Sequence, residues 1–285
     1  MLLKSTIQLL RFHFSFFLLP VYLFALSQLH ELNWSRAALI FIILHLLVYP
    51  SSNGYNSYMD HDETPIGGIR NPMQPTKELF YVTVAMDIIA LVLSLYINFA
   101  FFLCISLYIL ASRAYSYRRI RLKKYPILGF LTVFTFQGAL IFFATFFTLQ
   151  TTQEINVPIL PCVISSLLIG ALYPLTQIYQ HEEDKKDGVI SISYLLGKRL
   201  TFVFSMLLFL AATFLFYLRF HQQDELKYFY WYLAIMLPVV LFFLYWMMQV
   251  WKNEEAASFR NSLLMNVLST LCTTVFFIIL IVAKH

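Results

Sequence analysis

The sequence predicts an all-α fold, a bundle of about nine helices that cross a membrane. Of its 285 residues, 60% are hydrophobic, and the mean hydropathy is +0.70. Only 12% are charged, about half of the roughly 25% that is usual in soluble domains. The apolar residues gather in long stretches, and a helix needs about 17–25 such residues to cross a bilayer. We therefore expect residues 1–285 to form a single transmembrane domain.

Nine apolar stretches follow one another with short polar segments between them. The first contains Pro20 and lacks a convincing small-residue cleavage site, so we interpret it as a retained helix rather than a signal peptide. The second is short, and the third and fourth nearly run together across Tyr96-Ile97-Asn98. The predicted spans cover residues 10–29, 36–51, 79–97, 98–113, 126–148, 157–179, 199–218, 229–249 and 262–283.

Basic residues in the loops predict the orientation, because cytoplasmic loops carry an excess of Lys and Arg. With the N-terminus in the cytoplasm, sixteen of the 20 Lys and Arg fall on the cytoplasmic side, leaving Arg36, Arg219, Lys227 and Lys284 on the other. The odd number of spans then places the C-terminus outside. The net charge of +5 is dispersed over several loops, which indicates affinity for anionic membrane lipid and gives no reason to expect nucleic acid.

Two short acidic clusters interrupt the apolar chain, both on the predicted cytoplasmic side. They are NGYNSYMDHDE, residues 53–63, and QHEEDKKDG, residues 180–188, and together they hold seven of the 15 acidic residues. In the first, Asn53, Asn56, Asp60 and Glu63 recur in steps of three, four and three, which places them on one face of a helix. The first cluster therefore predicts an acidic helical face that extends the second span.

The second cluster shows the same helical spacing. Gln180 and Asp184 are four residues apart, as are Glu183 and Asp187. Carboxylate and amide oxygens are the ligands that Mg²⁺ takes when it also holds a substrate phosphate. We infer that two acidic faces converge on one Mg²⁺-bridged diphosphate; the alternative is a pair of solvated loops whose acids balance neighbouring Lys and Arg. The basic stretch SRAYSYRRIRLKK, residues 112–124, is either a topology anchor or a diphosphate clamp.

These residues resemble the UbiA superfamily of intramembrane prenyltransferases. The family's first motif, Asn-x-x-x-Asp-x-x-x-Asp, precedes an Arg-Pro-Leu-like turn, and here NGYNSYMDHDE precedes RNPMQP. Its second motif, Asp-x-x-x-Asp followed by Gly, leads to a Gly-Lys/Arg pair, as in QHEEDKKDGVISISYLLGKR. Between them, YSYRRIRLKKYPILGFL resembles the family's basic loop before the fifth helix. The sequence departs from the family's motifs at two positions. Gln180 stands where the second motif has its first Asp, and when the first motif is aligned from Asn56, Thr64 stands where that motif has its last Asp.

The resemblance, which covers essentially the whole chain, implies nine helices and Mg²⁺-dependent transfer of an isoprenyl group. The donor would be an isoprenyl diphosphate and the acceptor an aromatic or other lipophilic molecule within the membrane. The implied metal ligands are Asn56, Asp60, Asp62 and Asp184, helped by Glu183. The implied substrate-binding residues are Asn53, Gln180 and the phosphate-neutralising cations Arg118, Lys123 or Lys124.

Two further predicted site residues lie within apolar spans. Asp87 is inside the third span, where an ionisable group is costly and by default functional, so it is either a catalytic residue at the cavity or a hydrogen-bonded packing partner. Tyr173 precedes the second cluster and either reaches substrate or anchors the membrane interface. Two other function classes remain open: a non-catalytic relative that binds lipid or a partner, and a transporter, although the internal repeat expected of a transporter is not visible.

Overall fold

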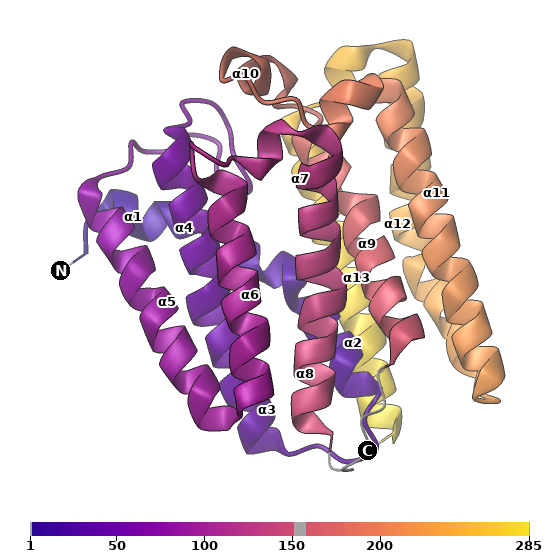
Figure 1. The fold of residues 1–285 in the computed structure, drawn as a ribbon. Helices are drawn as coiled ribbons and strands as arrows, with labels where there is room; N and C mark the ends of the chain where they lie inside the picture. The colour runs from indigo at the N-terminus through magenta and orange to yellow at the C-terminus, as the bar shows by residue number, and fades with distance from the viewer. Residues whose placement is uncertain (1, 151–157, 285) are drawn as a thin grey trace.

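The computed structural model describes residues 2–150 and 158–284, and it confirms the predicted all-α membrane bundle (Figure 1). Among the described residues, nine helical segments are long and apolar enough to cross a membrane. Their bounds are Lys4–Ser27, Trp34–Asp60, Lys77–Ile97, Phe99–Ser116, Pro126–Leu149, Ile159–Gln177, Ile192–Gln222, Leu226–Lys252 and Phe259–Lys284. Each overlaps one predicted span, because the length of an apolar run decides whether it can cross a bilayer.

Several spans are composite. The first consists of α1 (Lys4–Leu9), η1 (Phe12–Leu18) and α2 (Leu19–Ser27), and the second of α3 (Trp34–Phe41), η2 (Ile42–Val48) and α4 (Tyr49–Asp60). The fifth consists of α7 (Pro126–Val133), η4 (Phe134–Leu140) and α8 (Ile141–Leu149). The remaining spans are α5 (Lys77–Ile97), α6 (Phe99–Ser116), α9 (Ile159–Gln177), α11 (Ile192–Gln222), α12 (Leu226–Lys252) and α13 (Phe259–Lys284). The short helices between spans are η3 (Leu122–Lys124), α10 (His181–Lys186) and η5 (Glu254–Ala256).

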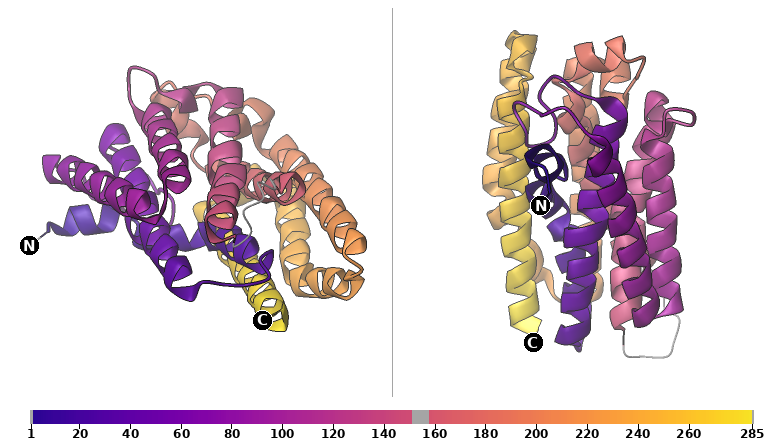
Figure 2. Two further views of the ribbon diagram at one scale, coloured as in Figure 1. Left: turned by 60° about the horizontal axis from the view of Figure 1, so that its bottom comes forward. Right: turned by 90° about the vertical axis from the view of Figure 1, so that its left-hand side faces the viewer.

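Both acidic clusters lie at one end of the bundle, which we call the polar end. It carries residues 61–76, 117–125 and 178–191, and α10 lies at the top of Figure 1 while the C-terminus lies at the bottom. Figure 2 shows the long helices running roughly parallel between the two ends. The polar connections after α4, α6 and α9 thereby meet on one side of the membrane-spanning layer.

The first span differs from the continuous helix that the sequence predicts. Arg11 has a left-handed backbone (φ 48°), which ends α1 and begins the 3₁₀ segment η1. Since only glycine adopts this conformation without steric cost, the break needs stabilising contacts elsewhere. Its consequence is that Arg11, instead of facing lipid, is turned into the bundle with 6% of its surface exposed.

The second span is longer than predicted, because η2 and α4 extend it to Asp60. Pro50, near the start of α4, has no N–H to bond to the preceding turn, and its ring crowds that turn. The π-helical segment η2 lies just before α4. Gly54 lets α4 approach α5 closely: a Cβ at this position would lie 2.9 Å from Thr83 Cγ2. Helix α4 is therefore packed tightly against α5.

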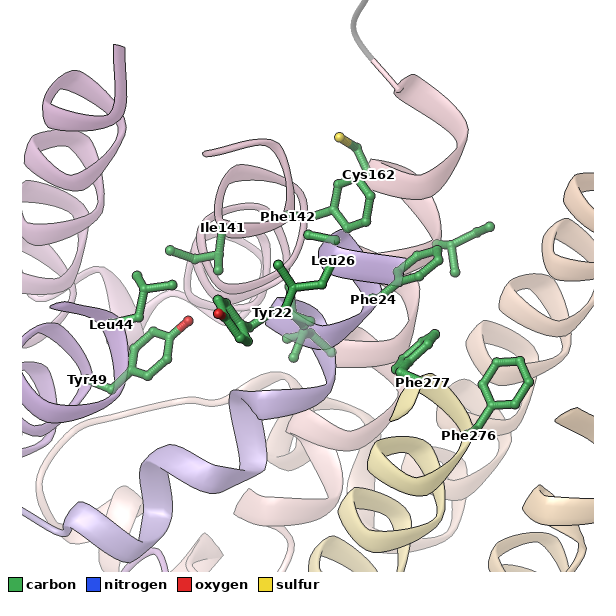
Figure 3. Packing of buried hydrophobic residues seen from close by; sticks show 14 of the residues in the cluster. Tyr22, Phe24, Leu26, Leu44, Tyr49, Ile141, Phe142, Cys162, Phe276 and Phe277 are labelled. Atoms are coloured by element: carbon green, nitrogen blue, oxygen red, sulfur yellow. The ribbon is translucent and has the colours of Figure 1, made fainter. Parts of the chain in front are cut away.

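The remaining boundaries follow from local chemistry and packing. The nearly fused third and fourth spans separate at Asn98, whose Oδ1 accepts a hydrogen bond from Phe101 N (2.7 Å) and begins α6. At the centre of the bundle the Phe24 ring lies 4.9 Å from each of the rings of Phe142 and Phe277 (Figure 3). This aromatic core joins α2, α8 and α13.

Candidate active site

A cavity of about 230 Å³ opens at the polar end, between the two acidic clusters. Its wall is built from η1, α4, α6, α7, η4 and α9, with α10 and residues 61–69 at its mouth. Five charged side chains line it: Arg11, Asp60, Asp62, Lys123 and Asp184. Deeper in the bundle the side chains of the cavity wall are uncharged. They are aromatic, aliphatic or neutral polar side chains, such as those of Tyr108, Phe136 and Leu172. The cavity therefore joins a charged mouth to an uncharged interior.

The first acidic cluster forms the predicted helical face. Asn53, Asn56 and Asp60 all lie on α4 and line the cavity. Asn56 Nδ2 donates to Asp60 Oδ2 (2.9 Å), which fixes the orientation of both side chains. The helix ends at Asp60, so Asp62 reaches the cavity from the following loop, whereas Glu63 is exposed. The prediction that Glu63 continues the α4 face is wrong, because His61 adopts a left-handed conformation and turns the chain away.

The second cluster meets the first as predicted. Asp184 and Gln180 both line the cavity, and Gln180 Nε2 donates to the carbonyl oxygen of Pro65 (3.3 Å) in the loop that follows the first cluster. Glu183 lies outside the cavity wall, where it pairs with Lys186 (3.7 Å) one turn along α10. Of the two carboxylates that the resemblance implies as metal ligands in the second cluster, Asp184 lines the cavity and Glu183 does not.

Three cations hold the acidic groups together at the mouth. Lys123 lines the cavity and forms an ion pair with Asp60. Arg121 pairs with Asp187 and lies 3.4 Å from Asp60 Oδ1, so it links the two clusters directly. Arg118 pairs with Asp187 at 3.4 Å and donates to the carbonyl oxygen of Met59 (2.7 Å). Of the three cations predicted to neutralise phosphate, Arg118, Lys123 and Lys124, only Lys123 lines the cavity.

The other two predicted cations occupy different places. Arg118 is half exposed outside the mouth, and Lys124 lies over the ring of Tyr125, 4.9 Å from its centroid. Neither is among the residues that line the cavity. The phosphate-neutralising role predicted for Arg118 and Lys124 is thus not supported by their positions. Arg121, which the sequence did not single out, takes the bridging place instead.

Arg11 is a second site residue that the sequence pattern did not identify. Its Nη2 donates to the carbonyl oxygen of Asn53 (3.0 Å) and approaches Asn56 Oδ1 (3.4 Å). Asp60 and Asp62 are close enough to interact with it electrostatically. Within the described part of the chain its Nε has no hydrogen-bond partner although it is buried. The left-handed break at Arg11 is the structural feature that brings this cation to the mouth.

Burial and mutual repulsion shift the pKa values of the mouth carboxyls. Burial, followed by the charges of Asp62 and Asp60, raises the pKa of Asp184 from 3.8 to about 7 against the opposing effect of Lys123. Burial and the charge of Asp60 likewise raise the pKa of Asp62 to about 6. Asp187 is different: partial burial opposes ionisation, but hydrogen bonding and charge from Arg121 lower its pKa. Burial thus favours the protonated form of Asp62 and Asp184, whereas the contact with Arg121 favours the ionised form of Asp187.

The raised pKa of Asp184 predicts a gain in stability when its charge is removed. The carboxyl of Asp184 binds a proton more tightly in the folded chain than in the unfolded chain. The protonated carboxyl therefore stabilises the fold fully below pH 3.8, and this stabilisation is lost as pH rises toward 7. We expect Asp184→Asn to raise the apparent Tm of the metal-free protein, and to raise it more at pH 8 than at pH 5. Thermal unfolding in EDTA measures this, with the exposed Glu182→Gln as control; a lower Tm at pH 8 would contradict it.

The donor set fits Mg²⁺ that is shared with a phosphorylated ligand. Within residues 2–150 and 158–284, no three His, Cys, Asp or Glu side chains enclose a metal position by themselves. Mg²⁺ usually keeps waters and binds one or two carboxylates together with substrate phosphates. Asn56, Asp60, Asp62 and Asp184 offer hard oxygen atoms around one mouth, where three carboxylates face two cations, Arg11 and Lys123. These residues suit an open site completed by a diphosphate.

The two predicted site residues within spans have different outcomes. Tyr173 lines the cavity, and its hydroxyl lies 2.5 Å from the Tyr115 hydroxyl and accepts from Gln177 Nε2 (2.8 Å). Asp87 does not line the cavity but forms an ion pair with Arg113 between α5 and α6. Of the two roles considered for Asp87, its position matches the hydrogen-bonded packing partner, because its carboxylate is directed to Arg113 in the helix interface.

Comparison with known proteins identifies a family and a fold. The model of the UbiA prenyltransferase family matches residues 16–270. A UbiA homologue from Archaeoglobus fulgidus bound to DMAPP and Mg²⁺ has a TM-score of 0.72 and 19% identity over 98% of this chain and 99% of that one. The apo structure of a UbiA homologue from Aeropyrum pernix K1 gives 0.70 and 18%, over 94% and 97% of the two chains.

A digeranylgeranylglyceryl phosphate synthase gives a TM-score of 0.64 and 22% identity over 98% of both chains. Among curated proteins there is no significant match. At these identities the solved structures establish the shared fold, and the family match rests on the sequence itself.

Proposed function

The chain belongs to the UbiA prenyltransferase family, and we propose that it transfers an isoprenyl group from an isoprenyl diphosphate to a lipophilic acceptor inside the membrane. The observation that carries the proposal is the meeting of both acidic clusters with Arg11 and Lys123 at the mouth of an apolar cavity. A charged mouth suits a diphosphate, and an uncharged interior suits the attached hydrocarbon. The A. fulgidus homologue, bound to DMAPP and Mg²⁺, supports this assignment by analogy of fold.

The residues at the mouth would bind and orient the diphosphate. Asn56, Asp60, Asp62 and Asp184 would hold Mg²⁺, which, when bound, neutralises the charge that develops on the leaving diphosphate. Arg11 and Lys123 would donate hydrogen bonds to the remaining phosphate oxygens. Lys123 is paired with Asp60 in the described structure, so it would exchange this carboxylate for phosphate as the ligands bind.

The reaction would proceed by breaking the allylic C–O bond, whose electron pair leaves with the diphosphate. The acceptor then forms a bond to the allylic carbon and loses a proton. The cavity wall below the mouth, which includes Tyr108, Phe136 and Tyr173, would keep water away from the cationic carbon. Ionisation is feasible in such a site because preorganised groups stabilise the leaving charge.

Metal dependence is the direct test of the site. We expect geranyl diphosphate to bind far more tightly with Mg²⁺ than in EDTA, and Asp60→Asn to weaken the Mg²⁺-dependent binding at least ~10-fold because the shared carboxylate loses its charge. Titration calorimetry measures both, with Glu63→Gln, an exposed carboxylate beyond α4, as the matched control. Equal binding with and without metal would contradict the proposed site.

Transfer itself is tested with purified protein, Mg²⁺ and a panel of aromatic and aliphatic lipophilic acceptors. Prenylated product from any acceptor supports the proposed activity. Tight metal-dependent binding without product from any acceptor would favour the alternative, a non-catalytic family member that binds an isoprenyl diphosphate.

The orientation of the bundle gives a separate prediction. From the excess of basic residues in its loops we predict that the polar end lies in the cytoplasm. We expect Glu63→Cys and Lys185→Cys, both exposed at the polar end, to react with a membrane-impermeant maleimide from the cytoplasmic side only. Lys227→Cys, exposed at the other end, should react only from the opposite side. The three native cysteines are replaced by Ala for this experiment, and labelling of the two ends from one side would refute the topology.

A further inference from the structure

Helix α4 carries Asn53, Asn56 and Asp60, yet its own backbone does not fix their position. Pro50 lacks the N–H that would bond to the preceding turn, and the segment that precedes α4, η2, is π-helical. Such an irregular junction allows the following helix to slide or rotate. The placement of the site residues on α4 must therefore be decided by contacts with neighbouring helices.

The two helices that pack beside α4, namely α5 and α6, are joined to each other by an ion pair inside the spans. Arg113 of α6 donates from Nε to Asp87 Oδ2 of α5 (2.9 Å), and its Nη2 forms a further short contact with the same oxygen. Their side chains are only 19% and 13% exposed. Charged groups at this depth are costly, and a buried ion pair often stabilises no more than apolar residues of the same volume. Stability alone therefore does not account for the pair.

The pair is connected to α4 through the hydroxyl of Ser51, which forms the hydrogen bonds, and through the ring of Tyr55. Ser51, which is fully buried, places its Oγ 2.6 Å from Asp87 Oδ1 and 2.9 Å from the carbonyl oxygen of Thr83, and accepts from Arg113 Nη2 (3.2 Å). One turn further along α4, the ring of Tyr55 lies 3.9 Å from Arg113 Cζ. Ser51 and Tyr55 thus fix one face of α4 to both α5 and α6.

The adjacent face of α4 faces the cavity and is bonded to the same turns of α6. Ser52 Oγ lies 2.6 Å from Ser112 Oγ, and Asn56 Nδ2 donates to Ser116 Oγ (3.1 Å). Ser112 and Ser116 flank Arg113 in the chain. The ion pair and the orientation of Asn56 are therefore parts of one interface, with about one helical turn between them.

We propose that Asp87 and Arg113 are positioning residues for the reaction. Acting through Ser51, they fix the height and rotation of α4 and so place Asn56 and Asp60 for Mg²⁺ and the diphosphate, a role that rests on the function proposed above. A slide of α4 by one residue would move these ligands by about 1.5 Å, and a misplacement of about 1 Å can cost roughly 100-fold in rate.

Ser51→Ala is the primary test, because it removes the link to α4 while leaving the ion pair in place. We expect the variant to bind inorganic diphosphate with Mg²⁺ at least ~10-fold more weakly than the wild type, with little change in the Tm of the metal-free protein. The matched control is Ser106→Ala on α6, whose hydroxyl donates only to the carbonyl oxygen of Phe102 in its own helix (2.7 Å) and which should bind like the wild type. Inorganic diphosphate is the probe because it reports on the mouth without the hydrocarbon chain.

The double variant Asp87→Leu/Arg113→Met separates positioning from stability. We expect it to keep the Tm of the wild type, since apolar residues replace the buried pair, and to lose at least ~10-fold in the same binding measurement. Wild-type affinity in either Ser51→Ala or the folded double variant overturns the inference. If the double variant does not fold, Ser51→Ala decides alone. Absence of Mg²⁺-dependent binding by the wild type would refute the proposed function itself, which is a distinct result.

Discussion

Asp184→Ala is expected to lower the rate of prenyl transfer at least ~100-fold, as is typical for the loss of one charged transition-state contact. Asp184 provides the only carboxylate through which α10 reaches the cavity among the described residues, because Glu183 is paired with Lys186 and Gln180 is neutral. Without it, Mg²⁺ would be held from one side of the mouth, by Asn56, Asp60 and Asp62. Single-turnover transfer at saturating donor measures the chemical step.

The control for Asp184→Ala is Glu182→Ala, which removes an exposed carboxylate from the same short helix. It should retain wild-type activity, since a distant solvated charge is screened. Full turnover in Asp184→Ala would show that the second cluster does not hold the metal and would remove the main support for a two-sided site.

Arg11→Met is expected to weaken isoprenyl diphosphate binding at least ~30-fold. The variant removes a cation whose guanidinium is held between Asn53 and the acidic mouth, while the apolar part of the side chain is kept. Loss of one partner of a buried hydrogen-bonded charge typically costs about 2–5 kcal/mol. Calorimetry with geranyl diphosphate and Mg²⁺ measures the effect.

Arg70→Met is the matched control for Arg11→Met, because Arg70 is exposed in the loop that follows the first cluster. It should bind the diphosphate like the wild type. Equal binding by both variants would show that Arg11 does not contribute to diphosphate binding and acts only at the junction between α1 and η1.

The sequence by itself determined the spans and the meeting of the acidic clusters. Span boundaries depend on the length of apolar runs and on polar residues such as Asn98, which are local properties of the chain. The clusters follow the second and the sixth spans, and the four spans between them place both clusters at one end. The face shared by Asn53, Asn56 and Asp60 follows from helical spacing alone.

The tertiary structure decided which charged residues form the site. Asp87 is 26 residues from Arg113 in the chain. No local sequence pattern indicates that Asp87 pairs with Arg113 and does not face the cavity. Arg11 reaches the mouth only because its backbone is left-handed, a conformation that no turn residue in the sequence indicates. Glu183 and Asp184 are neighbours in sequence, yet they point to opposite sides of α10, one to solvent and one to the cavity.

The physical reason is the range of the interactions involved. Hydrophobic length and helical periodicity act over one or two turns, so they can be read along the chain. The direction of a charged side chain is set by the cost of leaving it unpaired in a low-dielectric interior, and that cost depends on partners from other helices. In this protein those partners, Arg113 for Asp87 and Asn53 for Arg11, become neighbours only when the bundle has packed.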